Sequence, residues 1–169
     1  MRSRVPLVAA VSALALAGVL LVAVGVGYPP TAGLGSDGDY QWTSVTVADE
    51  NGTALATVRV RVADTYQKRY TGLSDTESLG RREGMLFVHP NEATHTYVMR
   101  RMDFPLDMLF VDANGTVTTI HHAPVPEDTP SEDLVRYRGR AKYVLEVPAG
   151  FANETGVEVG DCVSIPDDV

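Results

Sequence analysis

A polar cluster stands out because five side chains capable of chemistry occur within a short stretch. It contains His95, Arg100, Arg101, Asp103 and Asp107. His95 and Asp107 could carry out acid–base chemistry, while Arg100 could hold an anionic group through two parallel hydrogen bonds. The structural alternative is that Asp107 caps a turn after Pro105 and pairs with a neighbouring arginine. The residue types favour this structural role, and the segment remains the best candidate for a site because loops between strands often carry function.

Glu146 is a second candidate because it interrupts an apolar run, between Leu145 and Val147. If its side chain faces inward it needs a partner, for which we expect an arginine. A buried glutamate in a cleft would have a perturbed pKa, as functional groups often do. If it faces outward, it is simply solvated. The predicted ligand-binding residues are therefore Arg100, Asp103, Asp107 and Glu146.

The remaining residues that could bind metal or act as a nucleophile offer little support for either role. His121 and His122 would point to opposite faces of a strand, so they could not chelate one ion. The segment 112–115 begins like a calcium loop but lacks the later ligands. The lone Cys162 is expected to be a small core residue. Nucleotide-binding and serine-hydrolase motifs are absent from the sequence, so we expect no metal and no cofactor.

The N-terminal segment 5–27 contains 23 residues and no charge. As a helix it would extend about 34 Å, enough to span the hydrocarbon core of a bilayer. Arg2 and Arg4 precede it, and the next basic residue is Arg59. By the positive-inside rule, the N-terminus should be cytoplasmic and the rest outside.

The domain organisation follows from this segment and the Pro- and Gly-rich stretch after it. We predict a cytoplasmic tip (1–4), a single-pass transmembrane signal anchor (5–28) that contacts the lipid bilayer, a linker (29–39) and an exported β-rich domain (40–169). The alternative is a signal peptide that is cleaved, so that the domain is secreted. The apolar run is long for a signal peptide, and Ala23-Val24-Gly25 is only an approximate cleavage site.

The charge of the chain is strongly asymmetric. Its formal net charge is −8, and since Arg2 and Arg4 are the only charges before Asp37, the remainder carries about −10. This excess argues against binding to nucleic acid or anionic lipid. With 12 arginines, 2 lysines and abundant carboxylates, the composition is typical of a salt-adapted protein from a halophilic archaeon. A GC-rich genome with ordinary acidity would explain the arginines but explains the charge less well.

Short apolar stretches separated by turn residues predict a mostly-β (β-rich α+β) fold. It should be a compact barrel- or sandwich-like domain of about seven or eight short strands, with one or two small helices. Strands are expected at 40–48, 53–62, 84–88, 97–99, 108–111, 116–120, 143–147 and 163–165. Asp64 or Thr65 could cap a short helix that Gly72 ends. The segment 121–140 is predicted to be a long surface loop.

Three Asn-x-Thr sequons permit glycosylation if the cell has the machinery. They begin at Asn51, Asn114 and Asn153, all in predicted surface turns. The first two are also good hairpin turns, so their sequences have a purely structural explanation.

Four motifs occur in a recognisable order: GMLFVHP (84–90), TYVMRRMDFPLDMLFVDANGTV (96–117), AKYVLEVPAG (141–150) and VEVGDCV (157–163). Together they resemble the domain-of-unknown-function family number 192 of bacteria and archaea, over roughly residues 60–163. The resemblance implies a compact β-rich domain, often preceded by a signal or anchor segment, and no established activity. The family commonly has an aromatic-Trp pair followed by Met-Lys-Asn-Thr, whereas this chain has Tyr-Val-Met-Arg-Arg-Met from Tyr97.

Two functional hypotheses remain, beside a purely structural role without a small ligand. The first is an uncharacterised, membrane-anchored extracytoplasmic domain that binds a small ligand, a glycan or an envelope protein. The second is an envelope hydrolase or lyase that uses Asp107, His95 and Arg100. Convergence of these three side chains on one pocket would favour catalysis, whereas use of Asp107 for capping would favour binding.

Overall fold

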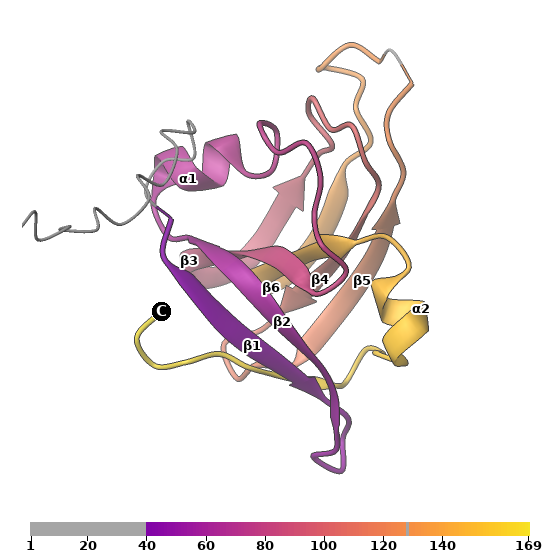
Figure 1. Cartoon of the computed structure of the whole chain (residues 1–169). Coiled ribbons are helices and arrows are strands. Elements are labelled where there is room, and N and C mark those ends of the chain that lie inside the picture. Colours follow the sequence, from indigo (N-terminus) through magenta and orange to yellow (C-terminus); the bar gives the residue numbers. More distant parts are fainter. Residues whose placement is uncertain (1–39, 128) are drawn as a thin grey trace, which may run out of the picture. The chain divides into compact units, whose positions relative to one another are not determined.

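The computed structural model describes residues 40–127 and 129–169, which contain seven β-strands and two short α-helices (Figure 1). The elements are β1 (Trp42–Ala48), β2 (Ala54–Ala63), α1 (Tyr66–Thr71), β3 (Glu83–Tyr97), β4 (Leu106–Val111), β5 (Val117–Ala123), β6 (Tyr137–Pro148), α2 (Phe151–Thr155) and β7 (Cys162–Ser164). The mostly-β class with two small helices is confirmed. The expected anchor and linker (1–39) lie outside the described residues. Within the described ranges, no helix is both long and apolar enough to cross a membrane.

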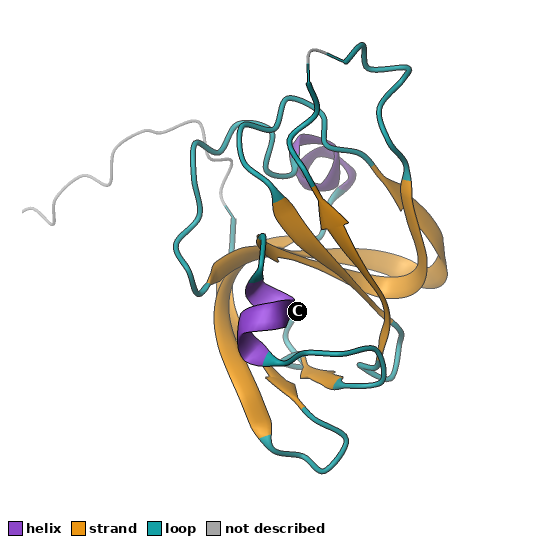
Figure 2. Cartoon of the chain, turned by 90° about the vertical axis from the view of Figure 1, so that its right-hand side faces the viewer, coloured by secondary structure: helices purple, strands orange, loops and turns teal. Residues whose placement is uncertain are grey.

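The strands form one curled sheet with the order β5-β4-β6-β3-β2-β1-β7. Neighbouring strands are antiparallel except β2 and β3, which are parallel. The ends of the sheet approach each other where Thr116 bridges Cys162 and the Val163 amide donates to the Gly115 carbonyl at 2.7 Å. The result is a half-barrel (Figures 1 and 2).

Local turn chemistry forms the two predicted hairpins. In the β1–β2 turn, Asp49 Oδ1 accepts hydrogen bonds from the amides of Asn51 and Thr53. Asp112 Oδ1 does the same for Asn114 and Thr116 in the β4–β5 turn. Such Asp-centred bonds fix a turn before any tertiary contact is made. These two hairpins are therefore as predicted.

The short helix α1 is also as predicted. Thr65 Oγ1 caps it by accepting from the Lys68 amide at 3.2 Å. Gly72 ends it with a φ of 52°, in the left-handed region that favours glycine. Since α1 buries none of its own residues, the capping bonds rather than a buried face define its ends.

Two predictions about strand boundaries are wrong. The expected strand 84–88 is part of a longer strand, β3, which continues through Pro90 to Tyr97, so the expected strand 97–99 does not form: Val98 and Met99 lie beyond the end of β3. Proline is tolerated there because the pairing with β6 is irregular between Val88 and Ala93. The predicted loop 121–140 is too long at both ends: β5 continues to Ala123, opposite Leu106, and β6 begins at Tyr137, opposite Tyr97. Both extensions depend on pairing with a distant strand.

The central strands are buried on both faces, and the apolar residues form two clusters. The first includes Val47, Val58, Leu86, Leu109 and Leu145 and packs against Phe151 and Ala152 of α2. The second lies on the opposite face and includes Leu73, Phe87, Met99, Met108 and Phe110. Side chains alternate between the clusters along β4 and β6, so neighbouring residues of one strand serve different faces.

Two further expectations need correction. Cys162 is exposed rather than part of the core, because β7 directs Val163 inward and Cys162 therefore outward. Asn51 and Asn114 are exposed in turns as expected, but the third sequon begins in a helix: Asn153 is an exposed residue of α2. Use of the sequons for glycosylation stays a prediction.

Candidate functional site

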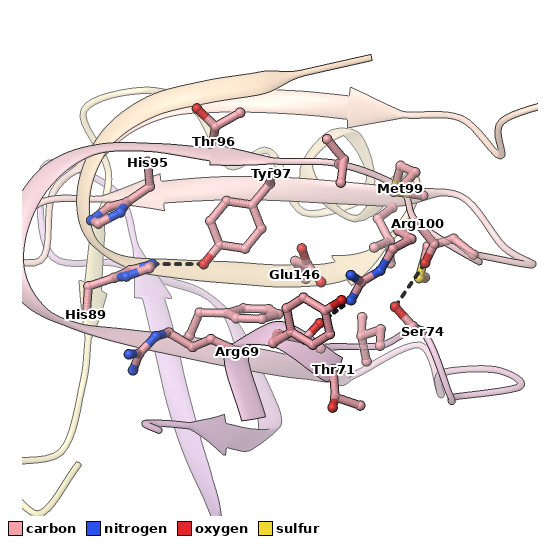
Figure 3. A pocket seen from close by; sticks show the side chains of 17 residues that line it. Arg69, Thr71, Ser74, His89, His95, Thr96, Tyr97, Met99, Arg100 and Glu146 are labelled. Carbon is pink, nitrogen blue, oxygen red and sulfur yellow. Dashed lines mark hydrogen bonds between the residues drawn. The ribbon is translucent and has the colours of Figure 1, made fainter. Parts of the chain in front are cut away.

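A pocket of about 280 Å³ lies between the end of α1 with the segment after it and the second half of β3 (Figure 3). Its polar lining is Arg69, Tyr70, Thr71, Ser74, His89, His95, Thr96, Tyr97, Arg100 and Glu146. Its larger apolar residues are Leu73, Phe87, Val98, Met99, Met102 and Leu106. A concave site with an apolar wall and a few convergent polar groups is the usual form of a small-ligand site.

Glu146 reaches the pocket from the centre of the sheet. On β6 it is opposite Met85 of β3 and Met108 of β4. The strands approach closely here: a Cβ on Gly84 would lie 2.4 Å from the Glu146 carbonyl oxygen. The Glu146 side chain faces the second apolar cluster and is only 5% exposed. No hydrogen bond or ion pair among the described residues uses its carboxyl, so the expected arginine partner is missing.

Burial of Glu146 has an electrostatic consequence. Loss of hydration disfavours the charged carboxylate and raises its pKa from 4.5 to about 8. Near neutral pH, the side chain therefore holds a proton and can donate a hydrogen bond. A protonated carboxyl facing a pocket is a candidate functional group on physical grounds.

Arg100 follows β3 and is held by the segment around α1. Its guanidinium lies 4.1 Å from the centre of the Tyr70 ring, and its Nη2 donates to the Tyr70 carbonyl oxygen. Ser74 Oγ donates to the Arg100 carbonyl at 2.9 Å. Arg100 Nε is buried and has no hydrogen-bond partner in residues 40–127 and 129–169. The arginine is therefore positioned, with one donor unused.

The next residue, Arg101, has a different environment. It adopts a φ of 52°, and its side chain forms an exposed ion pair with Asp75 at 3.1 Å. The two adjacent arginines therefore serve different purposes, and only Arg100 lines the pocket.

Arg69 supplies a second guanidinium to the pocket. It donates from Nη1 to the carbonyl oxygens of Asp64 and Val88, at 2.6 and 2.8 Å. The bond to Val88 ties α1 to β3, and the bond to Asp64 holds the same side chain to the segment before α1, so Arg69 both shapes the pocket wall and contributes positive charge.

Two histidines and a tyrosine of β3 form another part of the pocket wall. The rings of His89 and His95 are stacked with centroids 3.5 Å apart, and His89 Nε2 shares a 2.9 Å hydrogen bond with the Tyr97 hydroxyl. Burial, His95 and Arg69 together lower the pKa of His89 to about 4, so it is neutral at pH 7. Burial also raises the pKa of Tyr97. His95 Nε2 is buried, and none of the residues that the structure describes forms a hydrogen bond with it.

Asp107 lies on the opposite face of the sheet and does not line this pocket. Its Oδ1 pairs with His122 Nδ1 at 2.7 Å, and its Oδ2 accepts from the Ala152 amide at 2.9 Å. Asp107 thus has a structural role, as expected, but the partners predicted for it are wrong. It caps the start of α2 rather than a turn after Pro105, and its ionisable partner is a histidine rather than an arginine.

The cluster that is dense in the sequence is therefore divided in space. His95, Arg100 and Glu146 share the pocket, whereas Asp107 faces α2 and Asp103 is exposed outside the pocket. Consecutive strand residues face opposite ways, so proximity in sequence did not imply proximity of side chains.

Sequence reasoning missed several pocket residues: Arg69, Tyr70, His89 and Tyr97. His95 and Tyr97 have the two-residue spacing of one strand face, which could have linked them. Nothing local connects Arg69 or His89 to this face, because α1 and the irregularity in β3 intervene.

His121 and His122 are divided between the two faces, as the strand geometry predicts. His121 Nε2 is 2.8 Å from the Arg138 carbonyl oxygen, and His122 pairs with Asp107. In the part of the chain that the structure describes, no three His, Cys, Asp or Glu side chains are grouped so that they could hold a metal ion.

Comparison with known proteins gives consistent matches. A UPF0127 protein from Thermococcus sibiricus is 30% identical over 110 residues, which cover 62% of this chain and 64% of that protein. The chain therefore spans just under two thirds of the length of this relative.

Two crystal structures have similar folds. A candidate transcription regulator from Sinorhizobium meliloti 1021 has a TM-score of 0.66 and 31% identity, covering 74% of this chain and 94% of that one. A protein of unknown function from Novosphingobium aromaticivorans has a TM-score of 0.65 and 30% identity, covering 81% and 90%.

The family model DUF192, described as Uncharacterized ACR, matches residues 46–165. This match includes the end of β1, the whole of β2 to β7 and every residue of the pocket. It agrees with the resemblance noted in the sequence motifs. The chain therefore belongs to the DUF192 family.

Proposed function

We propose that this domain is a small-ligand-binding module displayed on the outer side of the cell membrane. One observation carries the binding role: three buried polar groups that have no hydrogen-bond partner among the described residues converge on one pocket. They are the Glu146 carboxyl, Arg100 Nε and His95 Nε2. Buried polar groups are nearly always paired in folded proteins, so such a concentration indicates groups that a ligand can satisfy.

Binding explains the arrangement better than the alternative hydrolase or lyase. That alternative needs Asp107, His95 and Arg100 at one centre, and Asp107 is on the other face of the sheet. The Ser74 hydroxyl donates to a backbone carbonyl, so it is not placed against a general base. The pocket residues are thus suited to holding a molecule rather than to attacking one.

The proposed location rests on the uncharged segment 5–27 behind Arg2 and Arg4, whether it remains as an anchor in the lipid bilayer or is cleaved to release the domain. The partner would be a small ligand, free or as part of an envelope glycan or protein. We do not extend a transcriptional role from the Sinorhizobium protein, because the net charge of about −10 after the apolar segment disfavours nucleic acid.

The binding role can be tested with a thermal-shift screen of the full chain against small polar metabolites and glycan fragments. We expect at least one compound to raise the Tm of the wild type and to lose this effect in Arg100→Met. Arg101→Met is the matched control, since it removes the same charge from the adjacent exposed position. Equal shifts in wild type and Arg100→Met would contradict binding in this pocket.

Topology needs a separate test. Intact cells that express the chain with a C-terminal tag are treated with protease, and the N-terminus of the mature protein is sequenced. An external location predicts loss of the tag without lysis, while the N-terminal sequence distinguishes an anchor from a cleaved signal. Protection of the tag in intact cells, with loss only after lysis, would refute the proposed location.

A further inference from the structure

We infer that the pocket binds a small organic carboxylate, whose anionic group interacts with Arg100 and Glu146 and whose apolar body lies against the methionine and phenylalanine wall. This inference rests on the proposed binding function and names its ligand class. It is argued from the charges that face the pocket, from its unused donors and from its apolar lining.

The charges around Glu146 favour an anion. Arg69 at the end of α1 and Arg100 after β3 contribute two guanidinium groups. From β3 the titratable groups that face the pocket are His89, His95 and Tyr97, and no second carboxyl is among the lining residues. Since burial keeps Glu146 protonated near neutral pH, the pocket is locally positive in an otherwise acidic chain.

Two donors in the pocket match the oxygens of a carboxylate. Arg100 Nε has no partner, although the same side chain already donates from Nη2 to Tyr70. The protonated Glu146 carboxyl can donate one hydrogen bond and is likewise unused. Figure 3 shows both side chains facing the same hollow. Charge-assisted bonds to a carboxylate would satisfy both, and such bonds are stronger than neutral ones.

The rest of the lining favours an organic ion over a small hydrated one. Leu73, Phe87, Met99, Met102 and Leu106 form an apolar wall in the same pocket. A hydrated inorganic anion would leave these apolar side chains exposed to water. A ligand with an apolar body would cover them, which is favourable because it removes apolar surface from water. A cation would face two guanidinium groups and would also require Glu146 to ionise.

Three probes of nearly equal shape test the charge preference: benzoate, benzamide and benzamidine, which are anionic, neutral and cationic. Binding to the full chain is measured by NMR or calorimetry near pH 7, with inorganic phosphate as a fourth probe. We expect benzoate to bind at least about tenfold more tightly than the other three. Tighter binding of benzamidine, equal binding of benzamide, binding of phosphate alone, or no binding of any probe would each overturn the inference.

The pH dependence tests the role assigned to Glu146. Above pH 8 the carboxyl ionises and repels the ligand, so benzoate affinity should fall about tenfold per pH unit. In Glu146→Gln the amide still donates and has no charge to lose, so benzoate should bind with a flat pH profile between about pH 7 and 9.5. A wild-type profile that is also flat, or a Glu146→Gln profile that still falls, would overturn the inference.

Arg100→Met should lose benzoate binding, while Arg101→Met should retain it. Retained binding in Arg100→Met would overturn the inference. These variants also separate its failure from that of the proposed function. If benzamide binds as well as benzoate and both are lost in Arg100→Met, the pocket is a ligand site but does not select an anion.

Discussion

Asp107 and Glu146 are two buried carboxyls on neighbouring strands, one on each face of the sheet. They lie almost side by side, since Met108 is opposite Glu146 and Asp107 is opposite Val147. Asp107 accepts one hydrogen bond from the Ala152 amide and shares another with His122. Within the part of the chain that the structure describes, the carboxyl of Glu146 has neither a hydrogen bond nor an ion pair, and it faces a pocket. Burial alone therefore does not distinguish a structural carboxyl from a functional one, but the partners do.

The largest effect on stability is expected from substitution of Asp107. Asp107→Ala would leave the Ala152 amide without its acceptor and break the bond to His122. We expect it to lower the free energy of unfolding by about 3 kcal/mol, because the buried Ala152 amide would be left without an acceptor and the bond to the exposed His122 would also be lost. Urea unfolding of both proteins measures this loss. A loss below about 1 kcal/mol would mean that Asp107 is not the structural member of the pair.

The second effect is the pH dependence of the folding stability that Glu146 causes. Its folded pKa of about 8 exceeds its unfolded value of 4.5, so the folded state binds more protons between these values. Its contribution to stability is full at low pH, decreases by about 1.4 kcal/mol per pH unit as the pH rises, and is lost above pH 8. His89 opposes it below pH 6.5, because its folded pKa is lowered to about 4. We therefore expect the clearest fall between pH 6.5 and 8.

This fall is measured by urea unfolding at a series of pH values. Glu146→Gln is the decisive comparison, because its side chain does not titrate and the fall should disappear. If both proteins change stability equally across this interval, Glu146 does not hold a proton in the folded state, and the contrast with Asp107 fails.

A smaller effect is expected for His122→Ala. This variant removes one of the two hydrogen bonds of Asp107 and leaves the bond from Ala152 intact. Because the His122 side chain is 59% exposed, we expect a loss of about 1 kcal/mol, clearly less than for Asp107→Ala. Chemical unfolding of both variants gives the ranking. A loss as large as that of Asp107→Ala would mean that the hydrogen bond to His122, rather than the one from the Ala152 amide, provides most of the stabilisation by Asp107.

The smallest effect is spectroscopic. His89 is half-buried, stacked on His95 and close to Arg69, and these three causes lower its pKa to about 4. In an NMR titration its ring signals should stay those of neutral imidazole down to about pH 5. Substitution of Arg69 by Met should raise this pKa slightly by removing a nearby positive charge. A wild-type His89 that titrates near 6.5 would mean that the pocket is more open to water than described.

Local patterns predicted the parts of this fold that depend on local chemistry. Asp49 and Asp112 organise their turns, and Thr65 and Gly72 delimit α1, through bonds or backbone angles a few residues away. Strand ends that depend on a distant partner were missed: β6 begins at Tyr137 because it pairs with Tyr97. The continuation of β3 through Pro90 was missed for the same reason.

In the candidate site, too, some features could be predicted from local sequence and others depend on distant contacts. His95, Arg100 and Glu146 were named from residue type and setting, and the structure brings these three into one pocket. Asp107 was named beside them, yet it is turned to the other face by the two-residue period of β4. Arg69 was missed because only the packing of α1 against β3 places it there, and His89 was missed because the irregular part of β3 separates it in sequence from His95, against which it stacks.

By itself, the sequence determined the mostly-β class, the two hairpins, the capped helix, the acidic balance and the family, because these depend on composition, order and short-range bonds. Only the tertiary structure decided which carboxyl is satisfied and which is left facing a pocket. The physical reason is that the partners of a buried polar group come from distant segments: Ala152 reaches Asp107 from α2, whereas none of the described segments brings such a donor to Glu146.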